Sequence, residues 1–228
     1  MSASKRAAGR RAADVVETGQ DVGLGTGSTV FFALERLGER IRDEGLVIRG
    51  VPTSVDTETK AREFGIPLAT LDEVERFDVT IDGADEIDGD YAMIKGGGGA
   101  LLREKVVAAA TEHMVVVVGP EKVVGTLGTT FDLPVEVVPF ARAAVERGIR
   151  ALGGAPKLRG AEGASYLTDN GNQILDVHFE SGISDAAQLE LALDAIPGVV
   201  ESGLFINLAR TLVIGHDDGS ADLRNKGA

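Results

Sequence analysis

Four short segments of the chain carry residue types that could do acid–base chemistry on an anionic ligand. One is the acidic turn Asp82-Gly83-Ala84-Asp85-Glu86, which follows a predicted strand. Two carboxylates three residues apart can face one cleft, where they could transfer protons or hold a hydroxyl-rich ligand. A solvated acidic turn and a magnesium site are the alternatives, and the spacing matches no calcium-binding loop. Spacing alone slightly favours the solvated turn.

A second segment contains four successive glycines, Gly96 to Gly99, between Lys95 and a predicted helix that carries Glu104. A glycine run costs chain entropy and is typical of a backbone that must approach a ligand closely. Free N–H groups at the helix start would form a positive pocket with Lys95. An acid at Glu104 could simply complement the helix dipole. The neighbouring glycines favour the other interpretation, in which Glu104 is a base beside an oxyanion site.

A third segment, Gly23-Leu24-Gly25-Thr26-Gly27-Ser28-Thr29, lies between a predicted strand and a predicted helix. A glycine turn followed by a helix start binds anions through convergent N–H groups, and the three hydroxyls could add donors. It is not a dinucleotide fingerprint, because Ser28 replaces the third glycine and no acid ends the next strand at Thr53-Ser54. It also lacks the Gly-Lys of a P-loop. Phosphate binding is favoured over a merely structural turn.

Composition restricts the remaining chemistry to Asp, Glu and Lys. The chain has no cysteine, which excludes disulfides, thiolate metal sites and thiol nucleophiles. The histidines, His113, His178 and His216, are far apart and form no metal-ligand spacing, and no serine is framed as G-x-S-x-G. We therefore expect no metal site. The fourth segment is Lys122, after the predicted strand 114–118, although a lone lysine there is usually only a surface charge.

The formal net charge is −13, from 23 basic and 36 acidic residues. A field of this sign repels phosphodiester backbones and anionic membranes, so we expect no nucleic-acid and no membrane partner. No apolar run approaches the roughly 20 residues that span a bilayer, and no signal peptide is recognisable, so we expect a cytoplasmic protein. Two interpretations of the charge stay open: an ordinary acidic cytosolic protein, and adaptation to concentrated salt.

Strands and helices alternate in the first 120 or so residues. Strands are predicted at 21–25, 46–53, 66–71, 77–81 and 114–118, with helices at 30–41, 55–64 and 100–113. Because the strand 114–118 is continuously apolar, it suits a sheet covered on both faces. The pattern indicates an α/β fold with a doubly wound, Rossmann-like sheet. All four segments lie where strands end and helices begin, which is the ligand-binding edge of such sheets.

After Gly125 the order becomes βαββαβ, which is that of a smaller ferredoxin-like α+β unit. Strands are predicted at 134–138, 157–168, 173–179 and 199–204, and helices at 141–152 and 184–196. Asn170-Gly171 is a strong hairpin signal between the middle strands. A last strand at 211–215 is expected to rejoin the first sheet. We therefore expect a Rossmann-like catalytic domain at 1–130 and 205–228, and a ferredoxin-like domain at 131–204.

Taken together, the segments resemble the type A ribose-5-phosphate isomerases, and the match runs from about residue 5 to 220. The order and separations of the motifs are also similar, which makes the combination far more specific than any one of them. The motifs that carry the resemblance are Gly25–Thr29, Asp82–Glu86, Lys95–Gly98, Arg103–Lys105, Leu133–Val137, Thr168–Asn172 and Ile196–Val200.

The resemblance implies an isomerase that interconverts D-ribose 5-phosphate and D-ribulose 5-phosphate through an enediolate, without a cofactor, in the pentose phosphate pathway. It implies a homodimer or homotetramer. Glu104 matches the family's catalytic base and would shuttle the proton. The chemistry then calls for Lys95 and the glycine N–H groups to stabilise the oxyanion, and for Asp82 or Asp85 to open the furanose ring. The positions that match the substrate-binding residues are Thr26, Gly27, Ser28, Thr29, Asp82, Gly83, Ala84, Asp85, Lys95, Gly96, Gly97, Gly98 and Lys122.

One stretch departs from the family. An acid and a Ser or Thr often precede the lysine that matches Lys122, whereas this chain has Gly119-Pro120-Glu121, which leaves the contacts of that loop in question.

Two other functions stay open. A non-catalytic sugar-phosphate sensor is disfavoured, because only about twenty residues precede the first strand and the charge is unsuited to DNA. A related deaminase or lactonase acting on another sugar phosphate is the other alternative.

Overall fold

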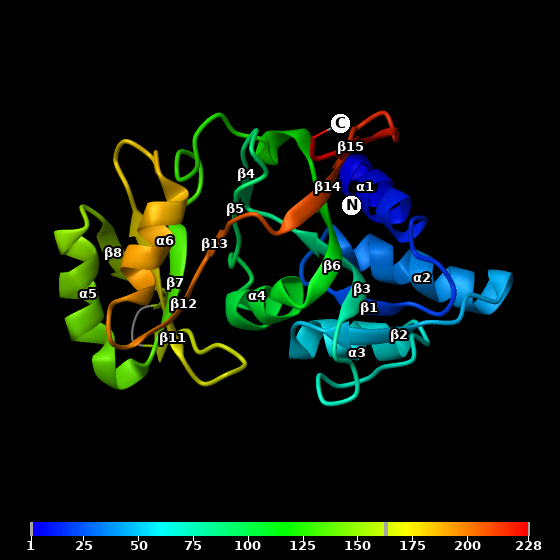
Figure 1. Ribbon diagram of the computed structural model, residues 1–228, viewed down its shortest axis with the longest axis horizontal. Coiled ribbons are helices and arrows are strands. Elements are labelled where there is room, and N and C mark those ends of the chain that lie inside the picture. The colour runs from blue at the N-terminus through cyan, green and yellow to red at the C-terminus, as the bar shows by residue number, and fades with distance from the viewer. Residues whose placement is uncertain (1, 162–163, 228) are drawn as a thin grey trace. The chain divides into compact units, whose positions relative to one another are not determined.

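The computed structural model describes residues 2–161 and 164–227, which form two compact units (Figure 1). Unit 1 comprises Met1–Ala84, Arg103–Val123 and Leu208–Ala228, and unit 2 comprises Asp85–Leu102 and Val124–Asn207. The sequence pattern assigns 85–102, 124–130 and 205–207 to the first domain, but the structure groups all three with unit 2. The reason is local, because Glu86 accepts hydrogen bonds from the backbone N–H groups of Gly128, Thr130 and Phe131.

Unit 1 is built on a six-stranded sheet in the order β15-β14-β6-β3-β1-β2. All neighbours pair in parallel except β14 and β15. The apolar residues of β6 are buried, as expected for a central strand covered on both faces. The predicted doubly wound sheet is therefore confirmed. The strands are β1 (Asp21–Leu24), β2 (Arg49–Pro52), β3 (Phe77–Gly83), β6 (Thr111–Val118), β14 (Ala209–Gly215) and β15 (Ala221–Asn225).

Helices α1 and α2 lie side by side in unit 1 (Figure 1), joined by ion pairs such as Arg10 with Glu39. Helix α2 is capped at its C-terminal end by Gly45, whose φ of 71° suits glycine. Ser54 begins α3 by accepting a hydrogen bond from the Thr57 N–H. None of the described helices is long and apolar enough to cross a membrane. The helices are α1 (Ala3–Ala13), α2 (Val30–Glu44), α3 (Val55–Glu63), α4 (Leu101–Ala109) and the 3-10 helix η1 (Pro120–Lys122).

Among the elements that the sequence predicted, three differ clearly from the structure. The expected strand at 66–71 is reduced to a single bridge between Gly50 and Leu68. Helix α4 ends at Ala109, and β6 already begins at Thr111. Strand β8 ends at Leu158, well before the expected end of that strand at 168, and residues 162–163 of the prediction lie outside the described part of the chain.

Unit 2 contains a four-stranded antiparallel sheet in the order β12-β7-β11-β8. Along the chain its elements run β7, α5, β8, β11, α6 and β12, which is the predicted ferredoxin-like arrangement. These elements are β7 (Leu133–Val137), α5 (Arg142–Ala151), β8 (Ala155–Leu158), β11 (Gln173–His178), α6 (Ala186–Asp194) and β12 (Val199–Ser202). The shorter ones are β4 (Glu86–Ile87), β5 (Met93–Ile94), β9 (Gly160–Ala161), β10 (Ala164–Ser165), β13 (Leu204–Phe205) and the 3-10 helix η2 (Pro139–Ala141).

The two faces of the unit 2 sheet differ in character. Val135 and Leu175 pair across the strands and share a buried core with Val145 of α5 and Leu193 of α6. Because side chains alternate along a strand, the next residues face the other way. The face turned away from α5 and α6 carries charged residues, including Asp176, which pairs with Lys157 across β11 and β8.

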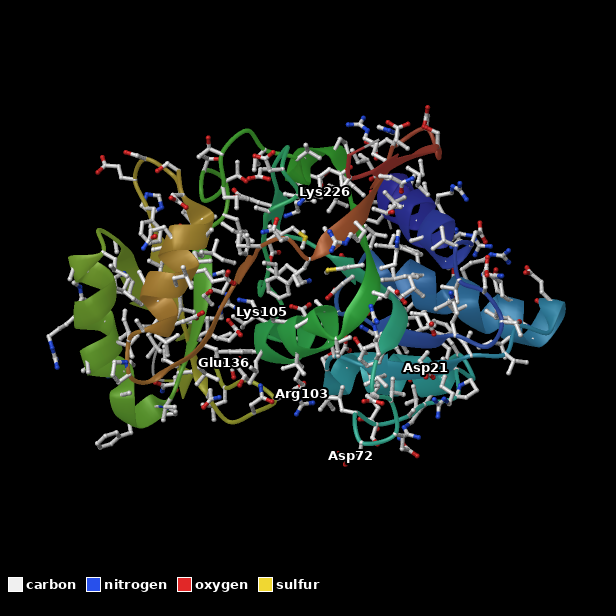
Figure 2. All side chains as sticks on the ribbon, viewed as in Figure 1. Asp21, Asp72, Arg103, Lys105, Glu136 and Lys226 are labelled. Atoms are coloured by element: carbon white, nitrogen blue, oxygen red, sulfur yellow. The ribbon has the colours of Figure 1, made fainter. Side chains whose placement is uncertain are left out.

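Glu136 also lies on the face of the unit 2 sheet that is turned away from α5 and α6, and it is labelled in Figure 2. Its buried carboxylate accepts hydrogen bonds from the Thr168 hydroxyl (2.9 Å) and from the side-chain amides of Asn170 (3.2 Å) and Asn172 (2.9 Å). Two of the recognised motifs, Leu133–Val137 and Thr168–Asn172, therefore meet at one carboxylate. This contact holds the predicted turn at Gly171 against β7.

Candidate active site

The segment Gly25–Thr29, which we call the β1–α2 loop, lies at the carboxyl end of β1 and at the start of α2. Strand β1 has β2 on one side and β3 on the other. The strand order therefore reverses beside β1, and that reversal marks the ligand-binding position of an open α/β sheet. Gly27, with φ of 118°, and Ser28 are exposed there. The predicted anion loop thus lies where an anion can reach it.

Thr26 fastens the β1–α2 loop to its neighbours. Its hydroxyl lies 2.8 Å from that of Thr53, 2.9 Å from that of Ser54 and 3.1 Å from that of Thr57. Thr57 in turn donates a hydrogen bond to the Gly25 carbonyl at 2.8 Å. Sequence reasoning missed this hydroxyl cluster. The signal was available, because three hydroxyl residues follow the strand that pairs with β1.

Lys5 is a further residue that the sequence analysis overlooked. Its ammonium donates a hydrogen bond to the Ser28 hydroxyl at 2.9 Å, so a cation from α1 lies at the β1–α2 loop. A lysine near the start of a chain gives no sequence signal for such a role. An ammonium beside a loop of exposed N–H and hydroxyl groups increases the attraction for a phosphate.

Asp82 is fully buried at the end of β3, so it does not belong to a solvated turn. Its Oδ1 accepts hydrogen bonds from the N–H groups of Thr26 (3.1 Å) and Gly83 (2.7 Å). Within unit 1 the structure therefore brings this predicted carboxylate together with the predicted anion loop. Gly25 packs so closely on the Asp82 carboxylate that a Cβ at Gly25 would overlap it.

The other two carboxylates of the acidic turn belong to unit 2. Asp85 is half-buried, and its Oδ2 accepts a hydrogen bond from the Gly97 N–H at 2.8 Å. Glu86 is fully buried, and its carboxylate accepts hydrogen bonds from the N–H groups of Gly128, Thr130 and Phe131 and from the Thr130 hydroxyl. Glu86 is therefore structural, whereas Asp85 meets the predicted glycine segment.

Lys95 to Gly99 form what we call the glycine loop. Lys95 is only 2% exposed, and its Nζ lies 5.4 Å from the centre of the Phe205 ring. The backbone N–H of Lys95 donates to the Gly203 carbonyl at 2.9 Å. A buried ammonium is energetically unfavourable unless neighbouring groups stabilise it, and such lysines cluster at functional sites. The loop turns tightly, with φ of 106° at Gly96 and 80° at Gly99.

Glu104 lies in the first turn of α4, between Arg103 and Lys105, which are labelled in Figure 2. It is only 5% exposed. Lys122 is half-buried at the end of the 3-10 helix η1, in which Pro120 of the departing Gly119-Pro120-Glu121 stretch occupies the first turn. Glu104 and Lys122 both belong to unit 1. Nowhere in residues 2–161 and 164–227 do three His, Asp or Glu side chains group as ligands for a metal ion.

The chain is similar to proteins of known activity over nearly its whole length. The family model described as ribose 5-phosphate isomerase A (phosphoriboisomerase A) matches residues 49–219. Ribose-5-phosphate isomerase A of Thermosynechococcus vestitus is 49% identical over 224 residues, which cover 96% of this chain and 94% of that protein. The protein of the same name from Ruegeria pomeroyi is 51% identical over 229 residues, covering 97% of this chain and 87% of the relative.

Solved structures agree with these relatives. Ribose 5-phosphate isomerase A of Methanocaldococcus jannaschii superposes with a TM-score of 0.92 at 39% identity, covering 97% of this chain and 98% of that one. The ribose 5-phosphate isomerase of Plasmodium falciparum has a TM-score of 0.93 at 36% identity, with 98% of both chains covered. The matched residues include the acidic turn, the glycine loop and Glu104, so the chain is an enzyme that isomerises ribose 5-phosphate and belongs to the ribose 5-phosphate isomerase A family.

Proposed function

We propose that the reaction moves one proton between C2 and C1 of the open-chain sugar phosphate through an enediolate, with Glu104 as the base. The observation that carries this proposal is the burial of Glu104 in the first turn of α4, six residues after Gly98. One carboxylate that reaches both carbons can take the proton from C2 and return a proton to C1. The conversion also moves a proton from the C2 hydroxyl to the C1 oxygen, and D-ribose 5-phosphate and D-ribulose 5-phosphate differ by these two hydrogen shifts.

Removal of the C2 proton places negative charge on the sugar oxygens, and that charge needs fixed donors. We assign this role to the Lys95 ammonium and to N–H groups of the glycine loop. Their burial and tight backbone support the assignment, because donors held in place before the reaction need no reorganisation during it.

Asp82 and Asp85 receive different roles. Asp82 is fully buried and holds the β1–α2 loop, so we assign it to positioning. Asp85 is half-buried, so we assign to it the opening of the furanose ring and contacts with sugar hydroxyls. These roles follow the surroundings of each carboxylate.

The β1–α2 loop, with Lys5 and Lys122, is the proposed phosphate site. Support comes from a related D-ribose-5-phosphate isomerase structure (TM-score 0.93, 35% identity), which was solved in complex with phospho-erythronic acid. That ligand combines a phosphate with a carboxylate, and we expect this chain to bind the same class of molecule. Binding energy from the phosphate would orient the reacting carbons.

We also carry over the family's place in the pentose phosphate pathway, a cytoplasmic location and a homodimer or homotetramer. Light scattering on the purified chain distinguishes the two assemblies from each other and from a monomer.

The direct test is Glu104→Gln, which keeps the size of the side chain but removes the base. We expect kcat to fall by about 10²–10⁴-fold, the usual contribution of a general base, with little change in KM. Wild type should exchange deuterium at C2 of ribose 5-phosphate with solvent, and the variant should not. Glu112→Gln is the matched control, because Glu112 is exposed in the same unit and pairs with Arg76.

A near-normal kcat in Glu104→Gln, or continued exchange at C2, would assign the base to another residue, and Asp82 and Asp85 would be next. Formation of the ketose from ribose 5-phosphate also separates isomerisation from a deaminase or a lactonase. Neither of those activities produces ribulose 5-phosphate.

A further inference from the structure

Arg159 binds backbone carbonyl groups of the glycine loop. This residue lies outside every motif recognised in the sequence. One nitrogen of its guanidinium, Nη1, donates to the carbonyls of Gly96 at 2.8 Å and Gly97 at 3.3 Å. The C=O and N–H of a trans peptide point in opposite directions. With both carbonyls directed at one nitrogen, the N–H groups of Gly97 and Gly98 point away from Arg159. The Gly97 N–H accordingly reaches Asp85.

Arg159 is itself fixed by Asp176, on the face of the unit 2 sheet that is turned away from α5 and α6. The guanidinium makes two hydrogen bonds to this carboxylate, one of them from Nε at 3.0 Å. Both side chains are largely shielded, at 17% and 26% exposed. The Arg159 N–H donates to the Ile174 carbonyl at 2.9 Å, which ties the backbone to β11. A guanidinium can bridge a carboxylate and two carbonyls because its donors form a rigid fork, which an ammonium lacks.

Tyr166 makes a second contact with the carbonyl groups of the glycine loop. Its hydroxyl donates to the Gly98 carbonyl at 3.3 Å, and its ring lies 5.9 Å from the Arg159 guanidinium carbon. Burial raises the pKa of Tyr166, so the hydroxyl keeps the proton that it donates. A Cβ at Gly99 would overlap this tyrosine, which shows how closely the loop packs on it.

We infer that Arg159, locked by Asp176, is a positioning residue for the isomerisation, because it turns the N–H groups of the glycine loop toward the side of Asp85. The inference rests on the proposed role of the glycine loop in stabilising the enediolate. Successive glycines have more backbone freedom than any other sequence, so the loop needs an external constraint to present its donors in one direction. The positive charge on the carbonyl side also polarises both peptide units, which strengthens their N–H groups as donors.

Arg159→Gln tests this inference, with Arg150→Gln as the matched control, since Arg150 of the same unit makes only an exposed pair with Glu146. We expect kcat of Arg159→Gln to fall by about 10- to 100-fold, as small misplacements of transition-state donors do, with KM within about twofold of wild type. Arg159→Lys keeps the charge without the fork and should recover only part of the activity. Amide hydrogen exchange at Gly97 and Gly98 should be faster in both Arg159 variants.

Chemical rescue provides a readout that a purely structural role would not produce. A cavity of about 550 Å³ is lined by residues that include Gly97, Arg159 and Asp176. In Arg159→Ala this cavity should admit a guanidinium ion, and millimolar guanidinium should restore part of kcat. Asp176→Asn removes the carboxylate that binds Arg159 and should also lower kcat. It provides a second variant if Arg159→Ala does not fold.

A kcat of Arg159→Gln within twofold of wild type would overturn the inference. The inference would also be overturned if the loss of activity equalled the fraction of unfolded protein and guanidinium did not restore it. The failure of this inference is distinguishable from that of the proposed mechanism. If Glu104→Gln abolishes exchange at C2 while Arg159→Gln is normal, only the role of Arg159 is wrong.

Discussion

The buried carboxylate of Asp82 accepts a hydrogen bond from the backbone N–H of Thr26, with 3.1 Å between oxygen and nitrogen. Asp82 lies near the end of β3 and Thr26 lies just after β1, and these strands are neighbours in the sheet. The shape of the β1–α2 loop therefore depends on a carboxylate from the next strand. The conformation of the loop is therefore determined by both strands, β1 and β3.

Gly25→Ala should disrupt this relationship. The added Cβ would overlap the Asp82 carboxylate, so the strand end or the carboxylate must shift. Overpacking of this kind typically costs about 1–3 kcal/mol, and we expect a lower melting temperature together with a higher KM for ribose 5-phosphate. Gly89→Ala, where a Cβ has open space, is the control. A Gly25→Ala enzyme with the wild-type KM would show that the loop does not depend on Asp82.

Lys5→Gln and Lys122→Ala should act mainly on KM. Each removes a cation from the proposed phosphate site, and a hydrogen bond to a charged group contributes about 1.5–3 kcal/mol, equivalent to roughly tenfold or more in KM. Steady-state kinetics with ribose 5-phosphate measure the effect. Lys60→Gln, in an exposed pair with Asp56, should leave KM unchanged. If either variant changed kcat and left KM unaltered, that lysine would not belong to the phosphate site.

Turnover should survive an excess of chelator. The proposed chemistry uses carboxylates and Lys95, and the chain has no cysteine. The measurement compares kcat before and after dialysis against a chelator. If the chelator abolished activity and magnesium or manganese restored it, the acidic turn at Asp82 to Asp85 would be identified as a metal site.

Molar salt should stabilise the protein if the net charge of −13 reflects a salt-adapted surface. Salt at 1 M shortens the Debye length to about 3 Å and so weakens repulsion among the acidic groups. We expect the melting temperature and kcat to rise between dilute buffer and molar potassium chloride. Equal melting temperatures at the two extremes would favour the interpretation as an ordinary acidic protein.

Lowering the pH should protonate Glu39 and remove its contribution to the free energy of unfolding. Its hydrogen bonds from Arg10 of α1 lower its pKa below the ordinary value of 4.5. A carboxyl with a lower pKa in the folded chain contributes stability above its unfolded pKa, and this contribution is lost as pH falls through the folded value. Partly exposed pairs contribute about 0.2–1 kcal/mol, so Glu39→Gln should lower the melting temperature at pH 7 by at most about 2–4 °C.

The difference between wild type and Glu39→Gln should shrink below pH 4.5 and disappear once Glu39 is protonated. Thermal unfolding of both proteins across this range checks the sign. Glu58→Gln, in an exposed pair with Arg62, is the matched control and should have a smaller effect. A difference that persists at low pH would show that Glu39 stabilises α1 and α2 by packing.

Local periodicity predicted the elements that bury a regular apolar face or stripe. Helix α2 and strand β6 were readable because their apolar residues recur with the period of a helix or form one buried run. Helix α1 escaped prediction because its buried residues are mainly alanines, such as Ala8 and Ala12, which carry little periodic signal. The strand expected at 66–71 is apolar enough but pairs at only one residue, and strand pairing depends on neighbours distant in sequence.

Residue types alone determined the class of chemistry: a chain without cysteine and with scattered histidines is left with carboxylates and lysines, and glycine runs mark the close backbone approaches. Only the tertiary structure decided which of these groups are buried and what they hold. Asp82 binds the N–H of Thr26, 56 residues away, and Arg159 binds the carbonyl of Gly96, 63 residues away. Such pairs arise from the order and register of strands, which short-range sequence patterns do not encode.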